Sequence, residues 1–218
     1  YLASMGAHVS ALDKREVLDT NLEDLEKMGV TFVLGQNYLD NLSGYDYILR
    51  SPGVKPFTPE LEKAVNNGAI LTSEIELLME LAPCKIVGVT GSDGKTTTTT
   101  LISMFLKEAG LKVWLGGNIG IPLFSKLDEI EENDIIVLEL SSFQLMTAQK
   151  SPDISVITNI SPNHLDYHRS YDEYITAKEN IFLHQHNGTV IFNADDEMTS
   201  RFLKDIADNK TETNIRYF

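Results

Sequence analysis

One pattern recurs along this chain: a helical stretch, then a glycine, then a short apolar run. Its five occurrences are Met5-Gly6, Met28-Gly29, Asn67-Gly68, Ala109-Gly110 and Asn187-Gly188. Glycine just past a helix relieves the left-handed conformation at that point, so each occurrence predicts a helix end that leads into a strand. Strands that alternate with helices, and not with tight hairpin turns, indicate parallel sheets joined by crossover helices. The pattern therefore predicts an α/β protein.

Further apolar runs complete the set of expected strands. They cover residues 45–49, 85–89, 135–140, 154–160 and 215–218. The continuous Val and Ile content of 135–140 and 154–158 is typical of strands covered on both faces. A change of composition near Leu81–Cys84 predicts one α/β unit over 1–82 and a second over 83–218. The chain opens on what reads as the last turn of a helix and stops on a strand, so both units are expected to be incomplete.

Composition restricts the class of partner. The 218 residues include 18 Lys+Arg and 32 Asp+Glu, a formal net charge of −14. Nucleic acid requires a basic surface and is not expected as a partner, whereas small phosphate ligands can be held by backbone N–H groups alone. The single cysteine, Cys84, excludes an internal disulfide. No apolar run approaches the roughly 18 residues of a membrane span, so we expect a cytoplasmic protein with no membrane partner.

A glycine-rich loop joins a predicted strand to a predicted helix. After strand 85–90 the loop reads Gly91-Ser92-Asp93-Gly94-Lys95-Thr96. Strand, glycine-rich loop, Gly-Lys-Thr and helix form the P-loop arrangement, in which backbone N–H groups and the helix N-terminus hold phosphates. We expect Lys95 to reach the β- and γ-phosphates and the Thr96 hydroxyl to bind Mg²⁺. Gly88 lies one position too far from Gly94 for the strict motif, and a glycine turn with a chance Lys-Thr is the alternative.

Threonine occupies all five positions from 96 to 100. β-branched residues are mediocre helix formers, so helix propensity does not explain the run. Proximity to a polyphosphate and a metal explains Thr96 and favours the same for Thr97. For the other three, tolerance of threonine in a first turn and bonding to backbone carbonyls is sufficient.

Candidate metal ligands follow two other predicted strands. Glu139 lies near the end of 135–140, at the edge of a parallel sheet where ligands bind, and its carboxylate suits Mg²⁺. The alternative is a charged residue that simply leaves the sheet. His164 takes the corresponding place after strand 154–160. A surface histidine is the commoner explanation for one such residue taken alone.

A lysine lies within an apolar helix face. Ser170 and Glu173 fit the S-x-x-E capping box, so a helix is expected to begin there. At 100° per residue, Lys178 falls in the middle of a face formed by Tyr174, Ile175, Ile181 and Phe182. An amine that loses water acquires a lowered pKa and becomes a neutral nucleophile. The alternative is an ammonium group that reaches solvent along the helix surface.

Together these motifs resemble the Mur ligases of bacterial cell-wall synthesis. The matching segments read GVTGSDGKTTTTTLI, GGNIG, VLELSSFQL, NISPNHLDYH and YITAKENIF. The ELSSFQL run resembles the members that add D-glutamate, and differs from sister ligases and folylpolyglutamate synthases. The resemblance implies a Rossmann-like UDP-sugar-binding domain over 1–82, truncated at its N-terminus. It also implies a central P-loop, parallel-sheet ATPase domain over 83–218, truncated at its C-terminus.

The resemblance also implies a role for each candidate residue. ATP is expected on Gly91, Ser92, Asp93, Gly94, Lys95, Thr96 and Thr97. Two Mg²⁺ ions are expected on Thr96, Glu139, His164 and a carbamate formed on Lys178. The UDP-sugar substrate is expected on Asp13, Ser51, Gly53, Asn118, Ser141 and Gln144. Lys95, Lys178 and His164 are the expected catalytic residues.

The implied reaction is ATP-dependent amide formation by a monomeric enzyme. ATP phosphorylates the carboxylate of UDP-N-acetylmuramoyl-L-alanine, and the amine of D-glutamate attacks the resulting acyl phosphate. The segment that holds adenine and the domain that selects the amino acid are expected beyond residue 218, so the isolated chain is not expected to ligate. The alternatives are another Mur-type or folylpolyglutamate-type amide ligase, a P-loop kinase, or a P-loop nucleotide-binding module without ligase activity.

Overall fold

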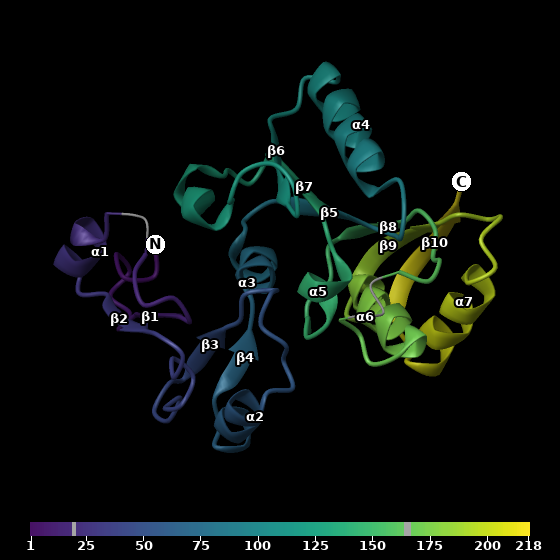
Figure 1. Cartoon of the computed structure of the whole chain (residues 1–218). Coiled ribbons are helices and arrows are strands. Elements are labelled where there is room, and N and C mark those ends of the chain that lie inside the picture. Colours follow the sequence, from purple (N-terminus) through teal and green to yellow (C-terminus); the bar gives the residue numbers. More distant parts are fainter. Residues whose placement is uncertain (19–20, 164–166) are drawn as a thin grey trace. The chain divides into compact units, whose positions relative to one another are not determined.

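The computed structural model describes residues 1–18, 21–163 and 167–218, which form a mixed α/β structure with parallel sheets, as predicted (Figure 1). The chain divides into two compact units, Tyr1–Ile48 with Lys55–Leu71 and Leu49–Val54 with Thr72–Phe218. The assignment of domains to 1–82 and 83–218 stays a prediction. Among the described residues, every helix is too short or too polar to cross a membrane.

The described part of the first unit contains short helices and two-stranded sheets. Its elements are β1 (Ser10–Asp13), α1 (Glu23–Lys27), β2 (Thr31–Leu34) and α2 (Pro59–Asn66). Strands β1 and β2 are parallel, with Ser10 opposite Thr31. A second pair is formed by β3 (Tyr47–Leu49) and β4 (Ile70–Thr72). Gly29 and Gly68 have φ of 81° and 100°, which confirms the predicted left-handed helix ends there.

The second unit is built on a six-stranded parallel sheet. Its strands are β5 (Lys85–Thr90), β6 (Val113–Gly117), β7 (Ile135–Glu139), β8 (Ile154–Ile157), β9 (His186–Phe192) and β10 (Glu212–Tyr217). Their order across the sheet is β10-β9-β8-β5-β7-β6, and each neighbouring pair is parallel. β5 lies between β7 and β8, so the strand order reverses next to it. Open parallel sheets bind their ligands outside the carboxyl ends of the strands at such a point.

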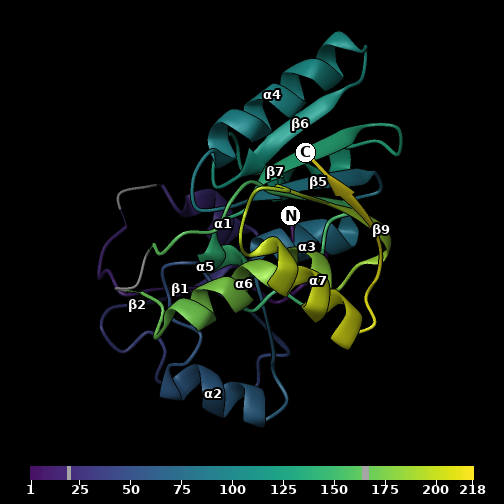
Figure 2. The same ribbon diagram turned by 90° about the vertical axis from the view of Figure 1, so that its right-hand side faces the viewer.

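Helices cover both faces of this sheet. α4 (Lys95–Glu108) packs on β5, β6 and β7, and α6 (Tyr171–Leu183) packs on α5 (Ser142–Leu145), β5 and α7 (Thr199–Asp208). Figures 1 and 2 show α4 on one face and α6 with α7 on the other. α3 (Glu74–Leu81) contacts the 3₁₀ helix Phe124–Glu129. The resulting coverage leaves Ile136, Val137 and Leu138 of β7 fully buried, as the apolar run predicts.

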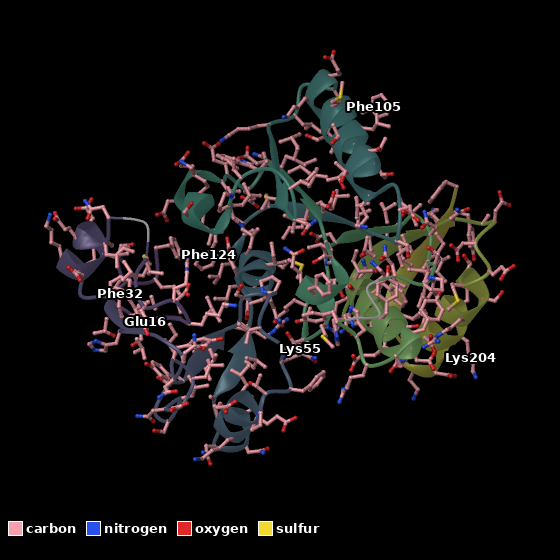
Figure 3. The ribbon with its side chains drawn as sticks, in the orientation of Figure 1. Glu16, Phe32, Lys55, Phe105, Phe124 and Lys204 are labelled. Atoms are coloured by element: carbon pink, nitrogen blue, oxygen red, sulfur yellow. The ribbon has the colours of Figure 1, made fainter. Side chains whose placement is uncertain are left out.

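α4 turns its small polar residues toward the sheet. Thr99 and Ser103 are buried, and the Thr99 hydroxyl donates to the carbonyl of Lys95 at 2.8 Å. The carbonyl bonding expected of the later threonines is thus confirmed for Thr99. Leu101, Met104 and Phe105 are exposed, and Figure 3 shows Phe105 directed away from the sheet.

The prediction of a helix end at Asn187-Gly188 is wrong. α6 ends at Leu183, and both residues lie inside β9. It is Asn187 that has a positive φ, of 60°. Gly188 is required by packing instead, because a Cβ there would lie 2.7 Å from Cδ of Gln185. Sequence alone does not separate these two reasons for a glycine.

Candidate functional site

The loop between β5 and α4 has a conformation that only glycine adopts easily. Gly91 has φ of 151°, and Gly94, the residue before the first turn of α4, has φ of 77°. A Cβ on Gly91 would also collide with Oγ1 of Thr158, at the end of β8. Both glycines are therefore required by the left-handed backbone, and Gly91 is also required by the close approach of Thr158.

The same loop is held in shape by polar side chains that follow β8. Thr158 Oγ1 donates to the Asp93 carbonyl at 2.6 Å, and Asn159 Nδ2 donates to it at 3.0 Å. In return the backbone N–H of Asp93 donates to Asn159 Oδ1 at 3.0 Å. The loop is thus organised by the protein itself, and binding of a phosphate would not have to fold it.

Ser92 and Lys95 differ in how they use this loop. Ser92 is buried, and its hydroxyl lies 2.8 Å from the Tyr174 hydroxyl and donates to the Ser161 carbonyl. It therefore connects the loop to α6. The Lys95 ammonium donates to the carbonyls of Gly91 and Ser92, both at 2.8 Å. It lies over the loop, in position to exchange these carbonyls for phosphate oxygens.

Glu139 is the centre of a three-residue cluster at the carboxyl edge of the sheet. Its carboxylate is 2% exposed at the end of β7. Oε2 accepts from the Thr96 hydroxyl at 2.7 Å, and Oε1 accepts from Asn118 Nδ2 at 2.9 Å. The alternative of a charged side chain that leaves the sheet is wrong, since Glu139 is buried. Three residues predicted from separate motifs thus meet in one place.

This cluster suits a magnesium ion. A hydroxyl and a carboxylate are the oxygen ligands that Mg²⁺ takes from proteins, together with phosphate oxygens and water. Among residues 1–18, 21–163 and 167–218, no three His, Cys, Asp or Glu side chains come together as a ready metal site. Thr96 and Glu139 would supply two ligands of such an ion. The predicted ligand His164 lies outside the described residues.

Lys178 is buried, which decides between the two interpretations of its place on the helix face. It is 1% exposed, and the alternative of a solvent-reaching ammonium is wrong. Nζ donates to Oγ1 of Thr90 at 3.2 Å and to the Gly91 carbonyl at 2.9 Å, and lies 4.9 Å from the Tyr174 ring centroid. Burial first, and then the charge of Lys95, lower the pKa of Lys178 to about 7. Both ammonium groups share the Gly91 carbonyl.

Burial of this amine predicts a cost in stability. We expect Lys178→Met to raise the free energy of unfolding at pH 6, in CO₂-free buffer, by about 1–3 kcal/mol, because the unfolded lysine is charged at no cost. The folded pKa is lowered, so the penalty is complete below about pH 7 and declines as the pH rises toward the usual lysine value. The advantage of methionine should decline in parallel.

Denaturant unfolding followed by fluorescence of Trp114, the single tryptophan and part of β6, measures this effect in the second unit. The exposed Lys204 of α7 gives the control Lys204→Met, for which no pH-dependent gain is expected. A Lys178→Met protein less stable than the wild type at pH 6 would contradict the argument.

A cleft of about 420 Å³ lies within the second unit. Its lining includes Arg50 and three residues predicted to bind the UDP-sugar, namely Ser51, Asn118 and Gln144. Gly53 belongs to the turn that begins at Ser51. Because Asn118 contacts Glu139, the cleft adjoins the P-loop cluster. The arrangement would place a ligand in the cleft next to a phosphate donor on the loop.

The other two predicted substrate residues have partners of their own. Ser141 and Gln144 form a capping box at the start of α5. The Ser141 hydroxyl accepts from the Gln144 backbone N–H at 3.3 Å. In return, Gln144 Oε1 accepts from the Ser141 backbone N–H at 2.9 Å. Asp13 ends β1 in the first unit, where Arg15 contacts its carboxylate at 2.7 Å. The hydrogen bonds from Arg15 lower the pKa of Asp13 to about 2.

Sequence reasoning missed Arg50, Thr158 and Asn159. Arg50 directly follows the apolar run 45–49, and Thr158 and Asn159 are polar residues near the end of the run 154–160, a signal similar to the one that identified Glu139. Arg50 is 3% exposed and lies on the cleft, and the other two organise the phosphate loop. These three residues could have been found by considering every polar residue near a predicted strand end, and not only the acidic ones.

Comparisons with known proteins agree with this geometry. The family described as the Mur ligase middle domain matches residues 89–217, and the family described as the Mur ligase MurD-like, N-terminal domain matches residues 1–73. UDP-N-acetylmuramoylalanine--D-glutamate ligase of Ruminiclostridium cellulolyticum is 54% identical over 205 residues, which are 93% of this chain and 44% of that protein. The ligase of the same name from Acetivibrio thermocellus is 51% identical, with the same coverage.

A solved structure shares the fold at lower identity. UDP-N-acetylmuramate:L-alanyl-gamma-D-glutamyl-meso-diaminopimelate ligase from Neisseria meningitides aligns with a TM-score of 0.57 and 19% identity, over 100% of this chain and 72% of that one. The chain spans about 44% of the length of the curated relatives named above. The match to the Mur ligase middle domain alone covers residues 89–217, which is more than half of the chain. The chain therefore belongs to the Mur ligase family.

Proposed function

We propose that this chain is the nucleotide-binding part of a ligase that adds D-glutamate to UDP-N-acetylmuramoyl-L-alanine in peptidoglycan precursor synthesis, with conversion of ATP to ADP and phosphate. The observation that carries the proposal is the Glu139 carboxylate, which holds Thr96 of the phosphate loop on one oxygen and Asn118 of the cleft on the other. The names of the relatives support the choice of substrates. The proposed ligase is a cytoplasmic monomer, without a membrane or nucleic acid as partner.

The phosphate loop supplies the binding of ATP. ATP is proposed to bind at residues 91–97. The backbone N–H groups of Ser92 and Asp93 donate to Asn159, so phosphate oxygens would be met by the N–H groups at the start of α4, where the helix dipole favours negative charge. Lys95 exchanges its two carbonyl partners for oxygens of the β- and γ-phosphates. Mg²⁺ on Thr96 and Glu139, with His164 as a further ligand, supplies neutralisation of phosphate charge when bound.

The cleft supplies the acceptor. Ser51, Gly53, Asn118, Ser141 and Gln144 orient the UDP-sugar. This leaves the alanyl carboxylate next to Lys95, so that its oxygen attacks the γ-phosphorus, the bond to the β-phosphate oxygen breaks and ADP leaves. The amine of D-glutamate then attacks the acyl carbon, loses a proton and displaces phosphate. Lys95 balances the charge that the phosphoryl group carries.

Lys178 has a separate role. Its lowered pKa makes a neutral amine available near neutral pH, and such an amine reacts with CO₂ to give a carbamate and a proton. The carbamate would replace the buried neutral amine with an anion that could help to hold a second Mg²⁺. Tyr174 covers the amine on one side, and Thr90 and Gly91 orient it.

Phosphate release tests the proposed function. A full-length ligase that carries this sequence is expected to release phosphate only when ATP, UDP-N-acetylmuramoyl-L-alanine and D-glutamate are all present. Release with ATP and an acceptor hydroxyl alone would indicate a P-loop kinase. Nucleotide binding with no release under any of these conditions would indicate a binding module. Each result identifies one of the functional classes that the P-loop leaves open.

A further inference from the structure

Arg50 is a buried arginine that donates hydrogen bonds to main-chain carbonyls of two separate segments. It is 3% exposed at the end of β3 and the start of the turn that contains Ser51 and Gly53. One terminal nitrogen, Nη1, donates to the Val54 carbonyl at 2.7 Å, and more weakly to those of Ser51 and Pro52 at 3.3 and 3.4 Å. The other, Nη2, donates to the Phe143 carbonyl of α5 at 2.8 Å.

Tyr167 makes a second connection between the same two segments. Its hydroxyl donates to the Pro52 carbonyl at 2.9 Å, and its ring centroid lies 4.3 Å from that of Phe143. Burial raises the pKa of Tyr167. Its hydroxyl is protonated at neutral pH, as that of an ordinary tyrosine is. We call Arg50, Phe143 and Tyr167 the turn clasp.

The turn clasp determines which edge of the turn is available to a ligand. In a trans peptide the N–H points opposite to the C=O of the same unit. The Pro52 carbonyl is directed at Tyr167 and Arg50, so the N–H of Gly53, in the same peptide unit, is directed away from them. The residue after Phe143 is Gln144, which lines the cleft. The turn clasp thus sets the direction of the Gly53 N–H and fixes the turn next to the segment that carries Gln144.

We infer that Arg50 and Tyr167 are positioning residues for the sugar nucleotide, which hold the Ser51–Val54 turn against α5 so that the Gly53 N–H faces the diphosphate. This inference rests on the proposed function. A planar guanidinium is needed because its two terminal nitrogens reach two separate segments at once, which a single ammonium group does not reproduce. Neither residue has to touch the ligand.

The test compares UDP with UMP, which lacks the second phosphate. Titration calorimetry on the 218-residue chain is expected to show UDP and UDP-N-acetylmuramoyl-L-alanine bound at least about tenfold more weakly by Arg50→Lys, from the loss of charge-assisted hydrogen bonds. Tyr167→Phe removes one neutral hydrogen bond and should weaken both by about threefold. Affinity for UMP should stay within about twofold of the wild type in both variants, since UMP lacks the group that the turn presents.

Matched controls come from β10. Arg216→Lys and Tyr217→Phe alter exposed side chains of the same types, and neither should change any of the three affinities. Loss of UMP and UDP binding in equal measure would show a merely structural role and overturn the inference. So would unchanged UDP affinity in both variants. If Arg50→Lys does not fold, Tyr167→Phe decides. Absence of sugar-nucleotide binding by the wild-type chain would instead overturn the proposed function.

Discussion

Substitution of Lys178 by alanine is expected to lower kcat for D-glutamate addition by about a thousandfold in a full-length ligase that carries this sequence, since it removes a charge from the reacting site. Acetate or another short-chain carboxylic acid should restore a measurable part of the activity. The cavity left by the side chain adjoins Thr90 and Gly91, where the free acid would supply the missing anion. Phosphate release gives the measurement.

The reason for so large an effect is the chemistry that a buried amine makes available. A buried amine costs stability, and its pKa of about 7 means that near neutral pH a large part of it is uncharged. The charge of Lys95 also repels the protonated form. The site therefore favours the neutral amine, the form that reacts with CO₂.

A direct measurement on the 218-residue chain distinguishes a carbamate on Lys178 from a role of this lysine in packing. With ¹³C-bicarbonate, the wild type should give a carbamate carbon signal that Lys178→Arg lacks. The signal should decrease as the pH falls below about 7, because the protonated amine does not react. Lys204→Ala is the control for the activity assay, and Figure 3 shows that lysine at the surface of α7. Full activity of Lys178→Ala without added acid would refute the carbamate.

Local patterns in the sequence were enough to predict most of the strands and to place Lys178 on an apolar helix face, but they left open whether its amine was buried or reached solvent. The strands follow from short apolar runs, and the place of the lysine follows from the 100° repeat of a helix. Both patterns can be read from a few consecutive residues. The carboxyl-edge position of Glu139 followed from the same reasoning, because parallel strands bring their ends to one edge. Its buried contact with Thr96 agrees with that expectation.

Contacts between distant segments were not predictable in this way. Arg50 and Phe143 are 93 positions apart, and Thr158 and Asp93 are 65 apart. The order of the sheet, with β5 between β7 and β8, determines both the loop geometry and the cleft, and no short motif encodes it. The same limit explains the error at Gly188, where a neighbouring side chain and not a turn requires glycine.

Glu139→Gln is expected to lower kcat by about a thousandfold and to remove most of the effect of Mg²⁺ on ATP affinity, since coordination of a metal at such a site is worth several kcal/mol. The substitution keeps the shape of the side chain. A glutamine oxygen still accepts from Asn118 Nδ2, and its amide still pairs with the Thr96 hydroxyl, so the buried cluster remains satisfied. What is lost is the negative charge that faces the cation.

Calorimetric titration of ATP with and without Mg²⁺ measures this in the full-length ligase. The wild type should bind ATP much more tightly with the metal, and Glu139→Gln should bind it about equally in both conditions. Glu132→Gln, at an exposed turn before β7, changes the net charge by the same amount and should behave as the wild type. If Glu139→Gln kept the full magnesium dependence, the ion would have to be held without this carboxylate.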